Sequence, residues 1–156
     1  MKHLFILFSF LFLAQVSFSQ TIMYKGDYEY ESEIIYVITG DKVYKGRTQM
    51  TGDIQYTIQD NKVYRGNSTF FSDCLYTIKG NKIYMGDGNF SSDVVYTVSE
   101  DKIYKGDSTF SQDAIFTFKD GKIYLGDSTF SNDVIFTVTI GSYTNLAVIA
   151  CVIGPY

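Results

Sequence analysis

The stretch AIFTFKDGKIYLGDSTFSND, residues 114–133, decides the fold because it recurs in recognisable form every twenty residues. Residues 114–118 place Ala and Phe at alternate positions, and a second strand-like run covers residues 122–125. Alternation with a period of two is typical of β-strands. Asp120-Gly121 stands between the two runs, and such residues tolerate the positive φ of a tight hairpin turn. The unit therefore predicts a two-stranded hairpin, followed by a polar, turn-prone connection over residues 127–133.

The unit occurs six times, with no insertion or deletion between Tyr24 and Thr137. A Tyr column consists of Tyr24, Tyr44, Tyr64, Tyr84, Tyr104 and Tyr124, and a Gly follows each Tyr by two positions. A second aromatic column consists of Tyr36, Tyr56, Tyr76, Tyr96, Phe116 and Phe136, and Thr follows it directly in the last five copies. The 14 Tyr, 13 Phe and single Pro also favour strands over helices. Equal spacing gives each copy the same neighbours, as in repeat proteins.

We therefore predict an all-β fold in which 20-residue hairpins form an extended or coiled antiparallel array over residues 21–140. A two-residue turn places Ile58 opposite Val63 and Tyr56 opposite Arg65. Both faces of the sheet then carry apolar columns, so some coiling or closure is expected. The alternative is a parallel β-solenoid with one copy per coil, which stacks like charges about 4.8 Å apart. That repulsion and the turn residues favour hairpins.

The six Tyr-x-Gly steps, such as Tyr104-Lys105-Gly106, sit in a hairpin repeat of a length seen in known families. The pattern resembles MORN repeats and the aromatic-rich hairpin repeats of choline- and glucan-binding modules. Residues 123–133 also look like repeats of uncharacterised bacterial secreted proteins. The chain lacks the Trp residues of choline-type repeats and the Gly and acidic run of MORN repeats. The resemblance implies a hairpin-repeat architecture and no particular function.

The first 20 residues have the pattern of a secretory signal peptide. Lys2 precedes an apolar run over residues 4–14, and the small residues near Ser17 and Ser19 suit cleavage near Ser19 or Gln20. The run is shorter than the roughly 20 residues of a membrane span. We expect a secreted, periplasmic or cell-surface protein with no transmembrane segment in the mature chain. A retained N-terminal anchor is the alternative.

The repeat pattern ends after Thr137, and residues 141–156 are predicted to form an apolar C-terminal cap. Residues 146–153 read LAVIACVI, too short to cross a bilayer. Repeat arrays need an atypical end unit that covers the last apolar face and blocks edge pairing. The β-branched residues favour a final strand, whereas the polar residues before Leu146 suit the start of a short helix. The alternative is a hydrophobic surface for a membrane or a secretion partner.

The composition argues against catalysis. The only histidine, His3, lies in the predicted signal peptide, so the mature chain lacks the usual general base and the commonest zinc ligand. Equivalent acids such as Asp93 and Asp113 have nearly equal surroundings, whereas glycoside hydrolysis needs two different ones. We expect no enzyme activity and no cofactor. A carboxylate-based glycoside hydrolase is the remote alternative.

Two repeated columns and two acid pairs are candidate binding or packing positions. Four tyrosines would stack sugar rings or cations if exposed, or pack across strands if buried: Tyr64, Tyr84, Tyr104 and Tyr124. Two acid pairs are weak calcium candidates, with turn capping as the more ordinary role: Asp107 with Asp113, and Asp127 with Asp133. A Phe column is expected to fill the hairpin junctions as core: Phe70, Phe90, Phe110 and Phe130.

Charge and cysteines limit the partners. The chain carries a net charge of −4, which does not suit nucleic acid. Cys74 and Cys151 both look like small buried residues, and a disulfide between them requires the array to fold back or close. An uncovered first strand, Ile22 to Lys25, permits self-association through sheet edges. We expect a non-catalytic protein that binds a cell-surface glycan or protein or acts as a scaffold, with carbohydrate binding through exposed Tyr as an alternative.

Overall fold

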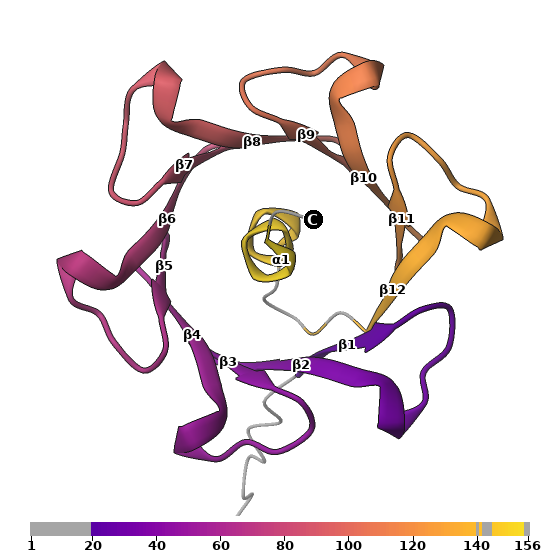
Figure 1. Cartoon of the computed structure of the whole chain (residues 1–156), viewed down its shortest axis with the longest axis horizontal. Helices are drawn as coiled ribbons and strands as arrows, with labels where there is room; N and C mark the ends of the chain where they lie inside the picture. The colour runs from indigo at the N-terminus through magenta and orange to yellow at the C-terminus, as the bar shows by residue number, and fades with distance from the viewer. Residues whose placement is uncertain (1–19, 140, 142–144, 155–156) are drawn as a thin grey trace, which may run out of the picture.

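Twelve strands form a closed antiparallel barrel around a short helix in the computed structural model, which describes residues 20–139, 141 and 145–154 (Figure 1). Except for Gln20, the predicted signal peptide lies outside these residues. In the first half of the chain the strands are β1 (Thr21–Lys25), β2 (Ile34–Thr39), β3 (Lys42–Lys45), β4 (Ile54–Gln59), β5 (Lys62–Arg65) and β6 (Cys74–Lys79). The remaining strands are β7 (Lys82–Met85), β8 (Val94–Ser99), β9 (Lys102–Lys105), β10 (Ala114–Lys119), β11 (Lys122–Leu125) and β12 (Val134–Thr139).

The hairpins form in the predicted register. Ile58 lies opposite Val63 and Tyr56 opposite Arg65 in the β4–β5 pair. All the strand pairs in the described residues are antiparallel, so the parallel solenoid alternative is wrong. The prediction of hairpins is confirmed, but the array is closed into a ring rather than extended.

The turns explain why Gly, Asn and Asp occupy the two positions between paired strands. Asp60 and Asn61 have φ values of 52° and 60°, the left-handed backbone of a hairpin turn. Glu100 adopts φ 54° as well, although its side chain gives it no such preference. The repeat therefore imposes its turn geometry even where the sequence suits it least.

A β-bulge at each junction between hairpins bends the sheet. In the β9–β10 pair, Ala114 lies opposite Tyr104 and Phe116 opposite Ile103, so one residue is extra. The same register shift recurs at the other five junctions. Bulges increase local twist and bend a strand. Six equal bends give the sheet the curvature that closes it.

The N-terminal strand closes the ring. β1 pairs with β2 on one side and with β12 on the other, where Tyr24 lies opposite Thr137. The predicted self-association through the edge of the first strand is therefore wrong, because both edges of β1 are already paired. Closure removes the free edges on which such pairing depends.

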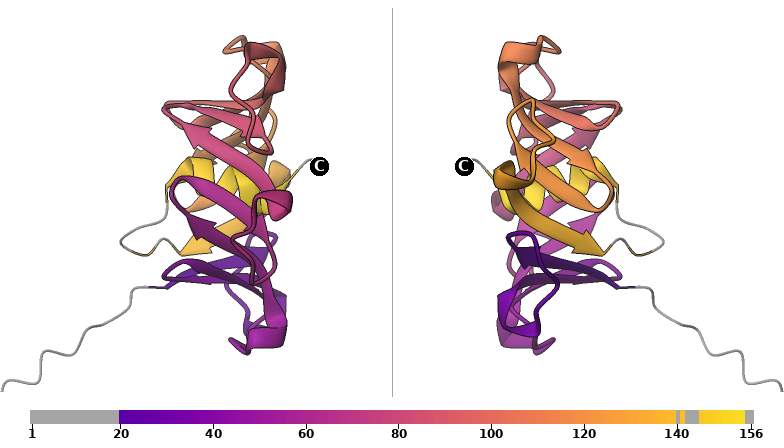
Figure 2. Two further views of the ribbon diagram at one scale, coloured as in Figure 1. Left: turned by 90° about the vertical axis from the view of Figure 1, so that its left-hand side faces the viewer. Right: turned by 90° about the vertical axis from the view of Figure 1, so that its right-hand side faces the viewer.

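Helix α1 (Leu146–Ile153) fills the interior of the ring (Figures 1 and 2). The side chain of Asn145 caps the helix by accepting a hydrogen bond from the backbone N–H of Val148. Residues 147–153 are all buried, as expected for a helix that is apolar all round. The segment is thus a helix, and it forms the centre of the core instead of covering the end of an array.

Six outer loops project from the ring and end in one turn of 3-10 helix (Figure 1). These turns are Glu31–Glu33, Thr51–Asp53, Phe71–Asp73, Ser91–Asp93, Ser111–Asp113 and Ser131–Asp133. Each loop begins at the Gly of a Tyr-x-Gly step, and Gly106, for example, has φ 65°. This conformation is open to glycine at little cost, which explains the repeated Gly.

Candidate functional site

The Tyr column lies on the outer face of the barrel wall, but its rings are largely shielded from solvent. Tyr64, Tyr104 and Tyr124 are each 8% exposed, and Tyr84 is half-buried beneath Lys79, whose Nζ lies 5.5 Å from the ring centroid. Sugar stacking on these four rings therefore lacks an exposed ring face, and their role is cross-strand packing with the Thr column. Thr57, for instance, lies directly opposite Tyr64.

The Thr column joins each strand to the start of an outer loop. The Thr117 hydroxyl donates to the carbonyl oxygen of Gly126 at 2.8 Å, and Thr97 donates to Gly106 in the same way. Thr57, Thr77 and Thr137 make the equivalent bond. These buried hydroxyls fix the direction in which the loops leave the barrel.

Lysine and aspartate link neighbouring repeats across the outer wall. Lys62 pairs with Asp87 at 2.5 Å, and Lys82 pairs with Asp107 at 2.7 Å. Lys102 with Asp127 and Lys122 with Asp27 continue the series around the ring. The hydrogen bond from Lys62 lowers the pKa of Asp87, and the bond to Asp107 raises the pKa of Lys82. These half-exposed pairs set loop position more than stability.

Side-chain hydrogen bonds also connect residues within three of the outer loops. The Ser108 hydroxyl donates to Asp113 at 2.5 Å and accepts from the backbone N–H of Phe110 at 3.2 Å. Ser68 and Ser128 make the same two bonds in their own loops. This bonding is local to the loop and leaves the residue at its tip without packing partners in the barrel wall.

The tips of the six loops carry large apolar or aromatic side chains that point away from the core. We call them the tip residues: Tyr30, Met50, Phe70, Phe90, Phe110 and Phe130. The four phenylalanines are between 72% and 76% exposed. The expectation that this Phe column forms core is wrong, because the loops place it beyond the sheet. The polar context of each Phe, as in Asp107-Ser108-Thr109-Phe110, is the sequence signal for exposure.

A groove of about 510 Å³ runs beside one tip residue. Phe130 forms one edge, and hydroxyl, carboxylate and ammonium groups line the rest: Glu100, Asp101, Lys102, Thr117, Lys119, Asp127, Ser128 and Thr129. The lining comes from the outer wall of β9 and β10 and from the following outer loop. An exposed ring beside several hydrogen-bonding groups suits a hydroxylated ligand.

The two acids of each candidate calcium pair are bonded to different partners. Asp107 and Asp127 each bind a lysine, while Asp113 and Asp133 each accept a hydrogen bond from a serine of their own loop. Within the described residues no group of three Asp, Glu, His or Cys side chains is arranged to hold a metal. The hydrolase candidates Asp93 and Asp113 lie on different outer loops, each bonded within its own loop.

The end of the barrel from which the outer loops leave is open, and we call it the mouth. Its rim residues are Lys25, Lys45, Arg65, Met85, Lys105 and Leu125, which alternation places on the same side of the sheet as the core. Lys45, for example, lies directly opposite the core residue Tyr36. Helix α1 ends at this mouth, as Figure 2 shows.

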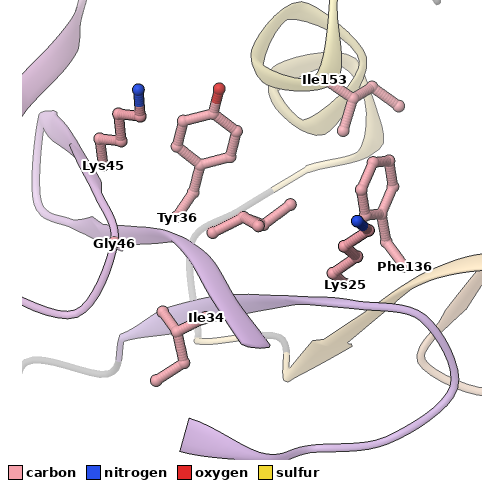
Figure 3. A pocket seen from close by; sticks show the side chains of 8 residues that line it. Lys25, Ile34, Tyr36, Lys45, Gly46, Phe136 and Ile153 are labelled. Carbon is pink, nitrogen blue, oxygen red and sulfur yellow. The ribbon is translucent and has the colours of Figure 1, made fainter. Parts of the chain in front are cut away.

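Figure 3 shows a mouth pocket of about 430 Å³ between the helix and the barrel wall. Its lining residues are Lys25, Ile34, Ile35, Tyr36, Lys45, Gly46, Phe136 and Ile153. A second pocket, of about 500 Å³, has residues from three repeats further along: Tyr76, Met85, Val94, Val95, Tyr96, Lys105, Gly106 and Ile115. Sequence reasoning missed these pockets because it did not foresee closure around a helix.

Sequence comparison places this architecture in a family. The family described as 6-fold beta flower protein matches residues 14–99, more than half of the chain. The chain belongs to this family. The six hairpins and six radiating loops of this beta flower protein agree with that description. The MORN and choline- or glucan-binding resemblance holds only at the level of hairpin repeats. No curated protein and no solved structure gave a significant match.

The two cysteines of this beta flower protein are both free. Cys151 is buried in the central helix, and its burial raises the pKa of the thiol. Cys74 lies on the outer wall, where its Sγ is 3.6 Å from the carbonyl oxygen of Tyr76. The barrel does close, as a disulfide required, but the wall separates the two side chains.

Among the described residues, no helix is long and apolar enough to cross a membrane.

Proposed function

We propose that this beta flower protein is a secreted or surface-located, non-catalytic binding protein that contacts its partner through the tip residues. The observation that carries the proposal is the exposure of Phe70, Phe90, Phe110 and Phe130, each more than 70% accessible. A large apolar side chain costs solubility when it faces water, and its repeated exposure in one ring is characteristic of an interaction surface. The predicted signal peptide supports an extracytoplasmic site of action.

The ring geometry supports multivalent binding. Six loops of similar conformation place their tips around one barrel; Ser–Asp bonds occur in three of them, and four Lys–Asp pairs link loops to the neighbouring wall. Several weak contacts on one rigid body bind a repetitive partner much more tightly than one contact does. A polymer or a densely populated surface therefore suits this ring better than a single small ligand.

We propose carbohydrate as the partner. Aromatic rings stack on the apolar faces of sugars, and the groove beside Phe130 offers hydroxyl, carboxylate and ammonium groups for the sugar hydroxyls. This transfers the sequence-based idea of sugar stacking from the covered Tyr column to the tip residues. The alternative partner, a cell-surface protein, uses the same rings without that groove.

The test replaces all four tip phenylalanines with serine and compares binding to a glycan array and to soluble polysaccharides. We expect binding by the unmodified protein, a graded loss as one, two and four tips are replaced, and no binding by the quadruple variant. The matched control replaces Met85 and Leu125, which are exposed apolar residues of the rim. Equal binding by the quadruple variant and the control would refute the role of the tips.

If no glycan binds but the protein attaches to cells in a tip-dependent way, the partner is a protein. If neither glycans nor cells are bound, the binding proposal fails.

A further inference from the structure

We propose that the mouth pocket beside Lys25 and Lys45 binds an anionic apolar molecule, namely a carboxylate attached to a hydrocarbon chain or ring. This site is separate from the tip residues, and the proposal does not depend on them. It rests on the shape of the pocket, on its charge and on a comparison between two repeats of the same chain.

The interior of the pocket is apolar. Ile34 and Ile35 come from the start of β2, Phe136 from β12 and Ile153 from the last turn of the helix. The volume of about 430 Å³ falls within the range of roughly 300–1,000 Å³ found for small-molecule sites. The interior therefore suits a hydrocarbon group.

The entrance of the pocket is cationic. Lys45 projects beside Tyr36 and Lys25 beside Phe136 (Figure 3), and no Asp or Glu lines the pocket. In the part of the chain that the structure describes, neither lysine forms an ion pair, whereas Lys62, Lys82, Lys102 and Lys122 all do. Two ammonium groups with no ion-pair partner among the described residues suit a carboxylate.

The end of α1 supplies the competing explanation for these lysines. The last carbonyl groups of a helix carry partial negative charge, which also attracts cations. If Lys25 and Lys45 serve only the helix, replacing them lowers stability without affecting any ligand. The test must therefore measure binding and stability together.

The second mouth pocket provides a matched control within the molecule. It is equivalent to the first pocket and lies three hairpins further round the ring. Met85 takes the position of Lys25, Lys105 that of Lys45 and Tyr76 that of Phe136. Its apolar lining is similar, but its entrance has one cation instead of two. Binding that depends on two ammonium groups should therefore occur in the first pocket and be weak in the second.

The experiment titrates octanoate, and separately octan-1-ol, into the mature protein by calorimetry. We expect one equivalent of octanoate to bind and octan-1-ol to bind at least about tenfold more weakly, because a charge-assisted bond is lost. Lys25→Met copies the residue of the second pocket and should weaken octanoate binding about tenfold. Met85→Lys should create a second site and raise the stoichiometry to two.

The quadruple tip variant should bind octanoate like the unmodified protein, which separates failure of this proposal from failure of the proposed function. The proposal is overturned if octanoate does not bind, if octan-1-ol binds equally well, or if Lys25→Met leaves the affinity unchanged. A lowered melting temperature of Lys25→Met without any octanoate binding assigns the lysine to the helix alone and also overturns it.

Discussion

At the scale of single residues, equivalent positions in different copies of the repeat carry different side chains. The Thr column has Val37 in the first copy, so one loop starts without the bond that Thr117 donates to Gly126. The inner aromatic column has Tyr96 in the fourth copy and Phe116 in the fifth. Such pairs show which side chains each position accepts and therefore which variants will still fold.

Replacing Thr117 with Val should lower the free energy of unfolding by about 1 kcal/mol, because the buried hydroxyl bond to the Gly126 carbonyl is lost while the side-chain shape is kept. Urea denaturation measures the change. Thr129→Val on the exposed part of the loop is the control and should have almost no effect. Equal effects of the two substitutions would contradict the role assigned to the Thr column.

Burial against the core raises the pKa of Tyr96 to about 12. The folded protein therefore holds this proton more tightly than the unfolded chain does. The resulting stability is fully present below about pH 10 and is lost as the pH rises from about 10 to about 12. Tyr96→Phe should make the loss of stability over this range less steep, and Phe116→Tyr should make it steeper. Unfolding curves at a series of pH values measure both slopes, and parallel slopes would contradict the assignment.

At the scale of elements, the barrel is stabilised by a helix that has no counterpart in the repeat. Ile149 is almost completely buried in the centre of α1, and Cys151 and Val152 are buried beside it. The eight-residue helix is too short to be stable alone in water. Its stability comes from the barrel around it, and the barrel in turn relies on the helix to fill its interior.

Ile149→Ala should lower the free energy of unfolding by about 2–5 kcal/mol, because it leaves a cavity in the middle of the core. Leu146→Ala, at the half-buried first turn, should cost clearly less. Thermal and urea unfolding measure both changes. A similar cost at the two positions would mean that the helix is not packed as the structure shows.

The sequence allowed some elements to be predicted and not others. Alternation and turn residues determine the hairpin register, so the pairing of Ile58 with Val63 was predictable. The bulge at Ile115 was not, because it shows no distinctive residue and only adds one apolar position. Alternation also does not say which face of the sheet is covered by loops, so burial of Tyr104 stayed one of two open readings and the expected burial of Phe110 was wrong.

At the scale of the whole molecule, closure depends on how much each repeat bends the sheet, a quantity that no single residue encodes. The position of α1 follows from closure and was hidden for the same reason. Its composition was nevertheless informative, since a helix apolar on all sides must be buried. The first mouth pocket lies between Ile153 of the helix and the ring, so it too lay beyond the repeat pattern.

Deleting β1 should open the barrel and expose the edges of β2 and β12, which pair with β1 in the intact protein. Free edges recruit other chains, so the shortened protein should form concentration-dependent oligomers. Sedimentation velocity at several concentrations measures this, with the full-length mature protein as control. A shortened protein that stays monomeric and folded would show that the β1 pairings are dispensable.

The bond from Thr137 to Gly26 joins residues 111 positions apart, and every other Thr–Gly bond of the column joins residues 9 positions apart. Hairpins and their neighbours can thus assemble locally and early, whereas the pairing of β1 with β12 must bring together the two ends of the repeat region. The entropy of closing so long a loop makes formation of the β1–β12 pairing late and slow relative to the local steps. Until it forms, the helix has no enclosed space to enter. The rate of refolding should therefore be governed by the pairing of β1 with β12. A circular permutant in which these two strands form one hairpin should shift the slow step to the strand pair at which the new chain ends meet.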